Sequence, residues 1–379
     1  MLRLLTAGES HGKTLLALID GFPAGLTIDE ESINRDLRLR QGGYGRGGRQ
    51  KLETDTVDVL TGVWHNTTLG SPVTLAVANH DYKLERLKDM DRPRPGHGDL
   101  SGAMKYLGSI RGILERASAR ETTVRVAAGS LAKQLLQQFG IEVLGYVTQL
   151  EQIVTSPRSG TIAELRTLRD ASPMYTLDPE ADPGIVKRVD EATASGDTLG
   201  GILECRVEGL PFGLGSHAQW DRKLDGLLAQ AVMSVQAIKG VEIGLGFEAA
   251  RRPGSQVHDP IQFDASKTDS PTLGYVRPTN NAGGVEAGMT NGQPLIIRAA
   301  KKPISTLRKP LESINLSTKE AENAAYERSD VCALAAAGII IEAVVAFTIA
   351  QSFVEKFGGD SIGEMHARYK SFLEMARQR

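Results

Sequence analysis

The sequence predicts an α+β fold built by internal duplication of one β/α unit. Strand-like and helix-like segments alternate along the 379 residues. Two helical patterns, at 120–139 and 224–238, are each followed by a glycine and a similar strand pattern, and GFPAGL at 21–26 is loosely echoed by GLPFGL at 209–214. We therefore expect a single large domain over residues 1–379 that contains two pseudo-repeated halves.

The first half begins with one predicted helix and two predicted strands. Thr27 and Glu30 have the spacing of a capping box, which predicts a helix that runs toward Leu39. Residues 51–60 alternate between apolar and polar side chains as a strand does, and residues 73–78 form a second strand pattern after a Gly-Ser-Pro turn.

The second half repeats this alternation. Residues 203–207 alternate with a period of two and are predicted to form a strand. After Asp221, the expected N-cap, apolar residues recur three and four apart through 224–238, which predicts an amphipathic helix. The strand pattern that follows at 240–244 resembles the one that follows the earlier helix, at 140–145.

Two segments stand apart from this repeat. Residues 155–200 are rich in Pro, Asp, Glu and Ser and are predicted to be a peripheral excursion that carries a short helix at 185–194. Residues 331–350 are nearly all apolar, but alanine dominates them and Glu342 sits in their middle. A buried helix of the core or of a subunit interface is therefore favoured over a membrane span.

The overall composition is that of a soluble globular protein with a large core, at 41% hydrophobic residues. The two cysteines, Cys205 and Cys332, lie far apart, without the spacing of a metal site or a disulfide framework. We therefore predict no bound metal, and a reducing cytoplasm is the simplest location. The N-terminal apolar stretch is too short to be a signal peptide, so no targeting segment is expected.

An arginine- and glycine-rich segment, residues 40–49, predicts an anion-binding loop. Arginine offers a planar fork of donors to carboxylate and phosphate, and glycine lets the backbone approach a ligand closely. This points to a small phosphorylated acid. A solvated surface loop is the ordinary alternative. An RNA-binding segment is a further one, disfavoured because the segment occurs once in a chain of net charge −2.

Residues 43–48 formally match a dinucleotide-binding fingerprint, but the surrounding elements argue against it. That motif needs a strand before it and a helix after it, whereas here a predicted helix precedes and a predicted strand follows. The match is interpreted as accidental, and a Rossmann fold is not expected.

Two histidines lie in glycine-rich turns, GESHG at 8–12 and RPGHGD at 94–99. Histidine is suited to moving protons near neutral pH, so the two indicate acid–base chemistry beside the anion-binding loop. His97 belongs to a long charged loop, 80–100, and a second long loop spans 251–292. Both are expected to close over a ligand.

Six motifs occur in one order along the chain, and each alone would be a weak signal. They are GESHG at 8–12, RPGH at 94–97, ERASARET at 115–122, NNAGG at 280–284, KPIST at 302–306 and RSD at 328–330. Together they resemble the chorismate synthase family over nearly the whole chain. The resemblance implies a β-α-β sandwich made of duplicated halves and assembled as a homotetramer, which is the chorismate synthase-like fold.

The resemblance also implies a reaction, the last common step of aromatic biosynthesis. 5-Enolpyruvylshikimate 3-phosphate would lose phosphate and a ring proton in a 1,4-elimination that gives chorismate. Reduced FMN would be required without net redox change. NADPH would serve only to reduce the flavin, and an outside source of reduced FMN is favoured because the sequence indicates no additional reductase domain.

Roles follow from the resemblance by matched position. His11 would be the general acid toward the departing phosphate, His97 would protonate or stabilise the flavin anion, and Asp330 would be the base at flavin N5. The residues that would bind the substrate anions are Ser10, Arg40, Arg46, Arg49, Arg94, Ser118 and Arg328. For Asp330 a helix-terminal ion pair, and for Ser118 an ordinary helical position, stay open as alternatives.

The flavin would be held by residues from four parts of the chain: Arg116, Ala117, Ser118, Gln236, Ala237, Ala287, Lys302, Pro303, Ile304, Ser305, Thr306 and Arg328. Ala287 departs from a position where the family often has glycine, which weakens that single contact. Two other classes of function remain: a non-catalytic anion- or RNA-binding module, and a lyase or phosphatase that acts on a phosphorylated acid without flavin. The chain is not expected to bind nucleic acid or a membrane.

Overall fold

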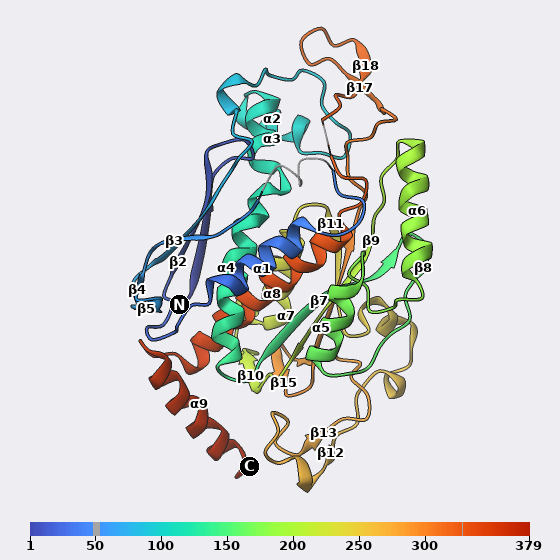
Figure 1. The fold of residues 1–379 in the computed structure, drawn as a ribbon. Coiled ribbons are helices and arrows are strands. Elements are labelled where there is room, and N and C mark those ends of the chain that lie inside the picture. Colours follow the sequence, from blue (N-terminus) through green and yellow to red (C-terminus); the bar gives the residue numbers. More distant parts are fainter. Residues whose placement is uncertain (48–53, 328) are drawn as a thin grey trace.

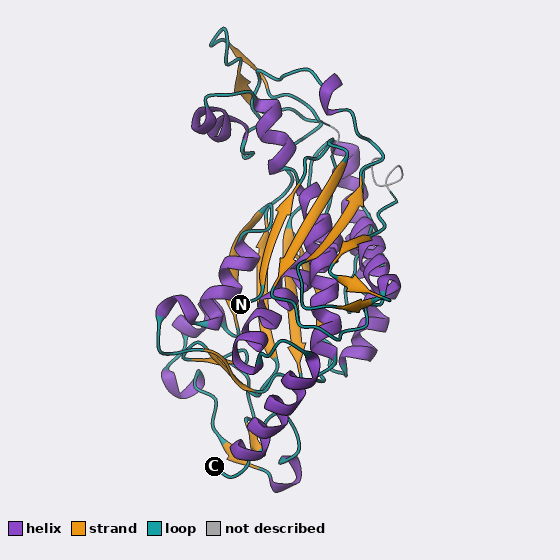
Figure 2. Cartoon of the chain, turned by 90° about the vertical axis from the view of Figure 1, so that its left-hand side faces the viewer, coloured by secondary structure: helices purple, strands orange, loops and turns teal. Residues whose placement is uncertain are grey.

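A computed structural model describes residues 1–47, 54–327 and 329–379 of the chain. These residues form a sandwich in which a layer of helices separates two antiparallel sheets (Figure 1). Figure 2 shows the long strands running along the length of the molecule. The first sheet has the order β1-β2-β6-β3, with β1 (Arg3–Ala7), β2 (Thr14–Asp20), β6 (Val73–Ala78) and β3 (Asp58–Thr61).

The second sheet lies on the other side of the helices and has the order β11-β16-β9-β7-β8. Its strands are β11 (Ile238–Ile243), β16 (Leu295–Lys301), β9 (Gly201–Glu208), β7 (Glu142–Leu150) and β8 (Ile153–Val154). Every strand pairing in the two sheets is antiparallel over the described residues. This confirms the predicted α+β class, because a Rossmann fold requires a parallel sheet.

The helical layer contains α1 (Glu30–Gln41), α4 (Thr122–Gln137), α7 (Leu224–Met233) and α8 (Leu334–Phe357). Helix α4 contacts β2 and β6 of the first sheet, and α8 contacts β7 and β9 of the second. Among the described residues α8 is the one helix long and apolar enough to cross a membrane, but its most apolar window is 94% buried inside the fold. The prediction of a buried core helix at 331–350 is confirmed.

A buried group of charged side chains ties this helical layer together. Glu342 of α8 accepts hydrogen bonds from Lys133 Nζ of α4 at 2.5 Å, Arg169 Nη1 at 2.8 Å and the Gly145 amide of β7 at 2.9 Å. Lys133 Nζ also pairs with Asp36 of α1 at 2.6 Å. These cations lower the pKa of Glu342 to about 2 against the opposing effect of burial. The contacts stabilise the charged forms of Glu342, Lys133 and Arg169.

Smaller elements surround the sandwich. The helices are α2 (Asp99–Tyr106), α3 (Ile110–Ala117), α5 (Ile162–Ala171), α6 (Asp182–Ser195) and α9 (Ile362–Ala376). The short strands are β4 (Val63–Trp64), β5 (Thr67–Thr68), β10 (Phe212–Gly215), β12 (Gln262–Phe263), β13 (Tyr275–Val276), β14 (Val285–Glu286), β15 (Met289–Asn291), β17 (Glu312–Ile314) and β18 (Ala321–Asn323). The 3₁₀ turns are η2 (Leu84–Arg86), η3 (Ala119–Glu121), η4 (Trp220–Arg222), η5 (Gly246–Arg251), η6 (Gly254–Gln256) and η7 (Ala265–Lys267).

Two boundaries predicted in the first half were wrong. The N-cap of α1 is Asp29 and not Thr27, because the Asp29 carboxylate accepts from the amides of residues 31 and 32. The strand predicted at 51–60 is confined to Asp58–Thr61 among the described residues, and residues 51–53 lie outside them. The amides of Asp55 and Val57 donate to side chains of α1 and its end instead of to a neighbouring strand.

Two predictions in the second half were also wrong in part. Helix α7 ends at Met233 rather than near Ile238, because Ala237 has a φ of 68° that no helix accommodates and Ile238 already pairs with Lys301 in the sheet. The N-cap of α7 is Lys223, so the prediction of Asp221 as N-cap was wrong. The excursion at 155–200 contains the predicted helix, as α6, and a second helix, α5, that was not predicted.

Candidate active site

A cavity of about 590 Å³ lies where the β1–β2 turn, the C-terminal end of α1 and the N-terminal end of α8 meet the loop that follows β16. Fifteen of the residues predicted for the site line this cavity: Ser10, His11, Arg40, Arg46, Arg94, His97, Ala117, Ser118, Gln236, Ala237, Lys302, Ile304, Ser305, Thr306 and Asp330. The structure thus brings together residues that are up to 320 positions apart (330 minus 10). This size suits a small-molecule ligand.

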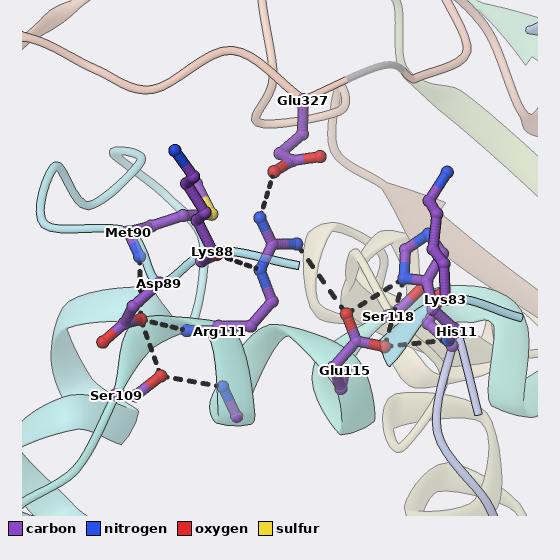
Figure 3. Close-up of polar contacts among 12 residues, drawn as sticks. His11, Lys83, Lys88, Asp89, Met90, Ser109, Arg111, Glu115, Ser118 and Glu327 are labelled. Atoms are coloured by element: carbon purple, nitrogen blue, oxygen red, sulfur yellow. Dashed lines mark hydrogen bonds and ion pairs between the residues drawn. The ribbon is translucent and has the colours of Figure 1, made fainter. Parts of the chain in front are cut away.

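His11 is held by a buried carboxylate. Its Nδ1 lies 2.9 Å from Glu115 Oε1, and its backbone amide donates to Glu115 Oε2 at 2.8 Å (Figure 3). The Asn79 side-chain amide donates to the carbonyls of Glu9 and Gly12 and fixes the turn around the histidine. Because Glu115 occupies Nδ1, proton transfer to a ligand falls to the other ring nitrogen, Nε2.

The Glu115 carboxylate is itself part of a chain of charges. Its pKa is lowered because hydrogen bonds from His11 and the charge of Arg111 outweigh burial, which acts in the opposite direction. Arg111 lies between Glu115, at 3.7 Å, and Glu327, to which Nη2 donates at 2.7 Å (Figure 3). This chain connects α3 to the segment that carries Asp330, across the cavity.

Replacing Glu115 with Gln should lower kcat roughly 10- to 100-fold, a part of the contribution that a well-positioned acid makes, and leave KM nearly unchanged. Glutamine keeps the size of the side chain but not the negative charge that contacts His11 Nδ1. Steady-state kinetics measure the split between kcat and KM. Glu327→Gln is the matched control, since it removes the other carboxylate on Arg111. Equal losses of kcat in both variants would contradict a role for Glu115 through His11.

His97, like His11, has a buried carboxylate as its partner. Its Nδ1 lies 2.5 Å from Asp99 Oδ1, and Asp99 also accepts from Arg94 Nε at 2.8 Å and from the Arg94 amide at 3.0 Å. These donors hold the pKa of Asp99 well below its usual range although burial opposes them. Arg94 Nη1 donates to Thr306 Oγ1 at 3.1 Å, which joins this loop to the KPIST segment.

Two further arginines present donors to the cavity. Arg40 is buried and donates to Thr122 Oγ1 at 3.1 Å and to the Ala119 carbonyl at 2.9 Å, and burial lowers its pKa to about 9. Arg46 pairs with Asp330 at 2.6 Å, and the Gly47 amide donates to the same carboxylate at 2.6 Å. Arg40 Nη1 forms no hydrogen bond to a described residue but lies 3.6 Å from Asp55 Oδ2, whereas Arg46 Nε is buried without a hydrogen-bond partner among the described residues and could donate to an anion.

Five predicted residues are not among those that line the cavity. Arg49 and Arg328 lie outside the described residues. The Arg116 guanidinium donates to Thr6 and to the Gly8 carbonyl. Pro303 interrupts the lining segment, and Ala287 lies in the turn between β14 and β15. The substrate contact of Arg49, the flavin contacts of Arg116, Pro303 and Ala287, and both contacts of Arg328 stay predictions.

Of the two long loops that were expected to cover the ligand, one lines the cavity and the other does not. The loop at 80–100 contributes seven residues to the cavity lining: Asp81, Lys83, Leu87, Arg94, Gly96, His97 and Gly98. The loop at 251–292 contributes none among the described residues, and its hairpin β12–β13 lies at the far end from α2 and α3 (Figure 1). The expectation that this second loop covers the same ligand was wrong for a single chain.

The polar residues of the site to which the sequence analysis assigned no role include Glu115, Asp99 and Lys301. Glu115 stands in the ERASARET motif and Asp99 two residues after His97, so proximity to a predicted residue was a usable signal. Lys301 precedes the KPIST motif and lines the cavity at the end of β16. Only its position on the inner face of a strand distinguishes it from a surface lysine.

The site defines a class of enzyme. Arginines with available donors surround one cavity, and two carboxylate-backed histidines stand beside them. Such a site binds a small polyanion and transfers protons to or from it.

Comparisons with known proteins agree with this class and define the family. Residues 2–354 match the family described as Chorismate synthase. The chain is 53% identical to the chorismate synthase of Geobacter sulfurreducens and 55% identical to that of Geobacter metallireducens, each over the full length of both chains. A solved structure described as a chorismate synthase superposes with a TM-score of 0.82 at 40% identity, covering 100% of this chain and 99% of that one. The chain belongs to the chorismate synthase family.

This family consists of carbon–oxygen lyases that act on a phosphorylated small molecule. They catalyse the 1,4-elimination of phosphate from 5-enolpyruvylshikimate 3-phosphate to give chorismate, in the shikimate pathway of aromatic amino acid biosynthesis. The family needs reduced flavin although the reaction involves no net redox change. It is a family of soluble biosynthetic enzymes.

Proposed function

We propose that the cavity between the β1–β2 turn and α8 is the active site at which this chain carries out the elimination. The observation that supports this most is the convergence of two carboxylate-backed histidines with Arg40, Arg46 and Arg94 on one cavity. The substrate carries two carboxylates and a phosphate, and several arginine forks around it compensate those charges.

The described residues divide the proton transfers between them. His11, which contacts Glu115 through Nδ1, is proposed as the general acid toward the oxygen of the departing phosphate. The arginines stabilise the negative charge that develops on that phosphate as the C–O bond breaks. Asp330, paired with Arg46, is proposed as the second acid–base group, which by the family resemblance would be the base at flavin N5. Arg49 and Arg328, outside the described residues, are proposed as further anion contacts.

The residues of the cavity also suit a bound flavin. One wall consists of the small apolar side chains Ala333, Ala336 and Ala337 of α8 and its start, which leaves room for a flat ring. Gln236 Oε1 is buried without a partner among the described residues and can accept from a ring N–H. Lys302 and Ser305, which both donate to the Gly96 carbonyl here, are proposed together with Thr306 to contact the FMN phosphate, and His97 is proposed to stabilise the reduced ring. When bound, reduced flavin supplies electron density to the substrate ring as phosphate departs.

The first experiment is anaerobic turnover of 5-enolpyruvylshikimate 3-phosphate with reduced FMN, with oxidised FMN, and with oxidised FMN plus NADPH. We expect chorismate and phosphate to form with reduced FMN alone, because we propose that the reductant comes from outside. Product in the NADPH arm would instead assign flavin reduction to this chain. Folded protein that binds FMN and gives no product in any arm would contradict the proposed function.

We further propose that the chain forms one domain of two pseudo-repeated halves and assembles as a homotetramer in the cytoplasm. Leu5 and Leu18 are paired in register on the first sheet and are 59% and 39% exposed, which supports burial of this face by another subunit. Sedimentation of the purified protein tests the assembly, and a monomer at micromolar concentration would contradict it.

A further inference from the structure

Lys301 is a buried, charged residue that lines the cavity and has no role in the proposed chemistry. It is the last residue of β16, where buried Leu295, Ile297 and Ala299 alternate with less buried neighbours. Lys301 continues this inner face and is only 7% exposed. An apolar side chain is the ordinary occupant of such a position, because a buried ammonium group is costly without a partner.

The ammonium group has no hydrogen-bonded partner within the described part of the chain. Lys301 Nζ is buried and makes no hydrogen bond to any described residue. Burial is the main cause that lowers the pKa of Lys301, with Arg46 and Lys302 acting in the same direction and Cys332 and Asp330 opposing them. Asp330, the carboxylate that acts on Lys301, is already paired with Arg46. The missing counter-charge is therefore an anion that enters the cavity.

The position of Lys301 favours one ligand over the other. Lys301 pairs in the sheet with Ile238, next to Ala237, and the following amide of Lys302 donates to the Ala237 carbonyl. Gln236 and Ala237 both line the cavity and are both proposed to contact the flavin, and Gln236 Oε1 has no hydrogen-bond partner among the described residues. Lys301 therefore adjoins residues proposed to hold the flavin, whereas Ser10 and His11 lie on the β1–β2 turn.

We propose that Lys301 is a flavin-binding residue whose ammonium group neutralises the anionic ring of reduced FMN. The inference rests on the proposed flavin site. Oxidised flavin has a neutral ring, while reduced flavin readily loses a ring proton and carries a negative charge near N1. A cation at this place makes the cavity prefer the reduced cofactor, which is the form that the family needs.

The test compares the affinities of oxidised and reduced FMN for the wild-type protein and for Lys301→Met, measured anaerobically, together with the midpoint potential of bound FMN. We expect the variant to bind reduced FMN about 10- to 100-fold more weakly, because a buried charge pair is lost, and oxidised FMN almost unchanged. The midpoint potential should fall by about 30 mV for each tenfold loss. Lys83→Met is the matched control, since Lys83 also lines the cavity but is paired with Asp81.

Folding is measured on the same variants without ligand. Lys301→Met should unfold at the same temperature as the wild type or higher, because it replaces an uncompensated buried charge with an apolar side chain of similar length. A clear loss of stability would instead mark Lys301 as structural and overturn the inference.

Three other outcomes also overturn it. An unchanged ratio of the two affinities shows that Lys301 does not sense the flavin charge. A weaker affinity for the substrate or for inorganic phosphate, with the flavin ratio unchanged, assigns the cation to the substrate. A wild-type protein that binds neither form of FMN removes the proposed function together with this inference, whereas the first two outcomes leave the proposed function standing.

Discussion

Replacing His11 with Ala should lower kcat by roughly 100- to 10,000-fold, the range that a positioned general acid contributes. The phosphate oxygen that departs must be neutralised as the C–O bond breaks, and without the imidazole only water is left to supply a proton. Binding of substrate should change much less, because Arg40, Arg46 and Arg94 remain around the cavity. Steady-state kinetics under anaerobic conditions with reduced FMN measure both quantities.

Two controls separate this chemical role from a structural one. His258→Ala removes an exposed histidine and should leave kcat within about twofold. The double variant His11→Ala/Glu115→Gln should be no slower than His11→Ala alone, because Glu115 acts through His11 and their effects then are not additive. A variant His11→Ala that retains more than about a tenth of wild-type kcat would contradict the assignment of His11 as general acid.

Replacing Glu342 with Ala should cost about 3–5 kcal/mol of unfolding free energy, the effect of removing one partner from a buried ion pair. The cost arises because Arg169 and Lys133 stay buried while one of their carboxylate partners disappears. The Gly145 amide would lose its acceptor as well. Against a total stability of about 5–15 kcal/mol for a typical protein, this is a large share. Denaturant-induced unfolding followed by circular dichroism measures it.

Glu355→Ala is the matched control on the same helix. Glu355 pairs with Arg222 at 2.7 Å, but both side chains are about half exposed, and exposed pairs contribute little. We expect a change of less than about 1 kcal/mol. Equal losses from the two variants would show that the buried group contributes no more than a surface pair.

The buried group also predicts a dependence of stability on pH. The pKa of Glu342 is lowered from 4.5 to about 2, so the unfolded state binds this proton first as the solution is acidified. The stabilisation from Glu342 is therefore present above pH 4.5 and is lost as the pH falls toward 2. Glu342→Gln lacks this proton exchange, so its stability should depend less steeply on pH in that window. Parallel pH profiles of wild type and variant would contradict the prediction.

Local patterns in the sequence were sufficient for much of the fold. The strand predicted at 73–78 is β6, residue for residue, and the helix predicted at 120–139 contains α4. In both segments the local sequence pattern and the tertiary structure favour the same secondary structure, so the prediction from the pattern holds. The burial expected for 331–350 also held, because a charged residue amid alanines is typical of a packed helix.

The errors arose where distant contacts decide the backbone. Ala237 adopts a left-handed conformation at the end of α7, and no apolar spacing reveals this. Asp55 leaves the strand pattern because Arg120, 65 residues away, binds its carboxylate at 2.8 Å. Helix α5 was missed although Thr161 and Glu164 form a capping box that could have been recognised.

The chemical roles of the site residues were predicted from the family resemblance, whereas the contacts between these residues became known only from the structure. Charged loops and glycine turns predicted an anion site with histidines, but only the structure joins His11 to Glu115 across 104 positions. The same holds for Lys301, because a lysine at the end of a strand looks like a surface residue until its burial is known.

Helix α8 contributes both to the cavity and to the stability of the core. Its first turns supply the alanines that line the cavity, and its middle carries the buried Glu342. A helix held by Lys133, Arg169 and the Gly145 amide cannot slide or tilt without breaking buried ionic contacts. The cavity therefore has one rigid side, and we expect adaptation to ligands of different shape to come from the loop at 80–100, which contributes seven of the lining residues. A larger side chain at Ala336 or Ala337 would reduce the volume of the cavity, so we expect these two positions to limit the size of the ligand that can bind.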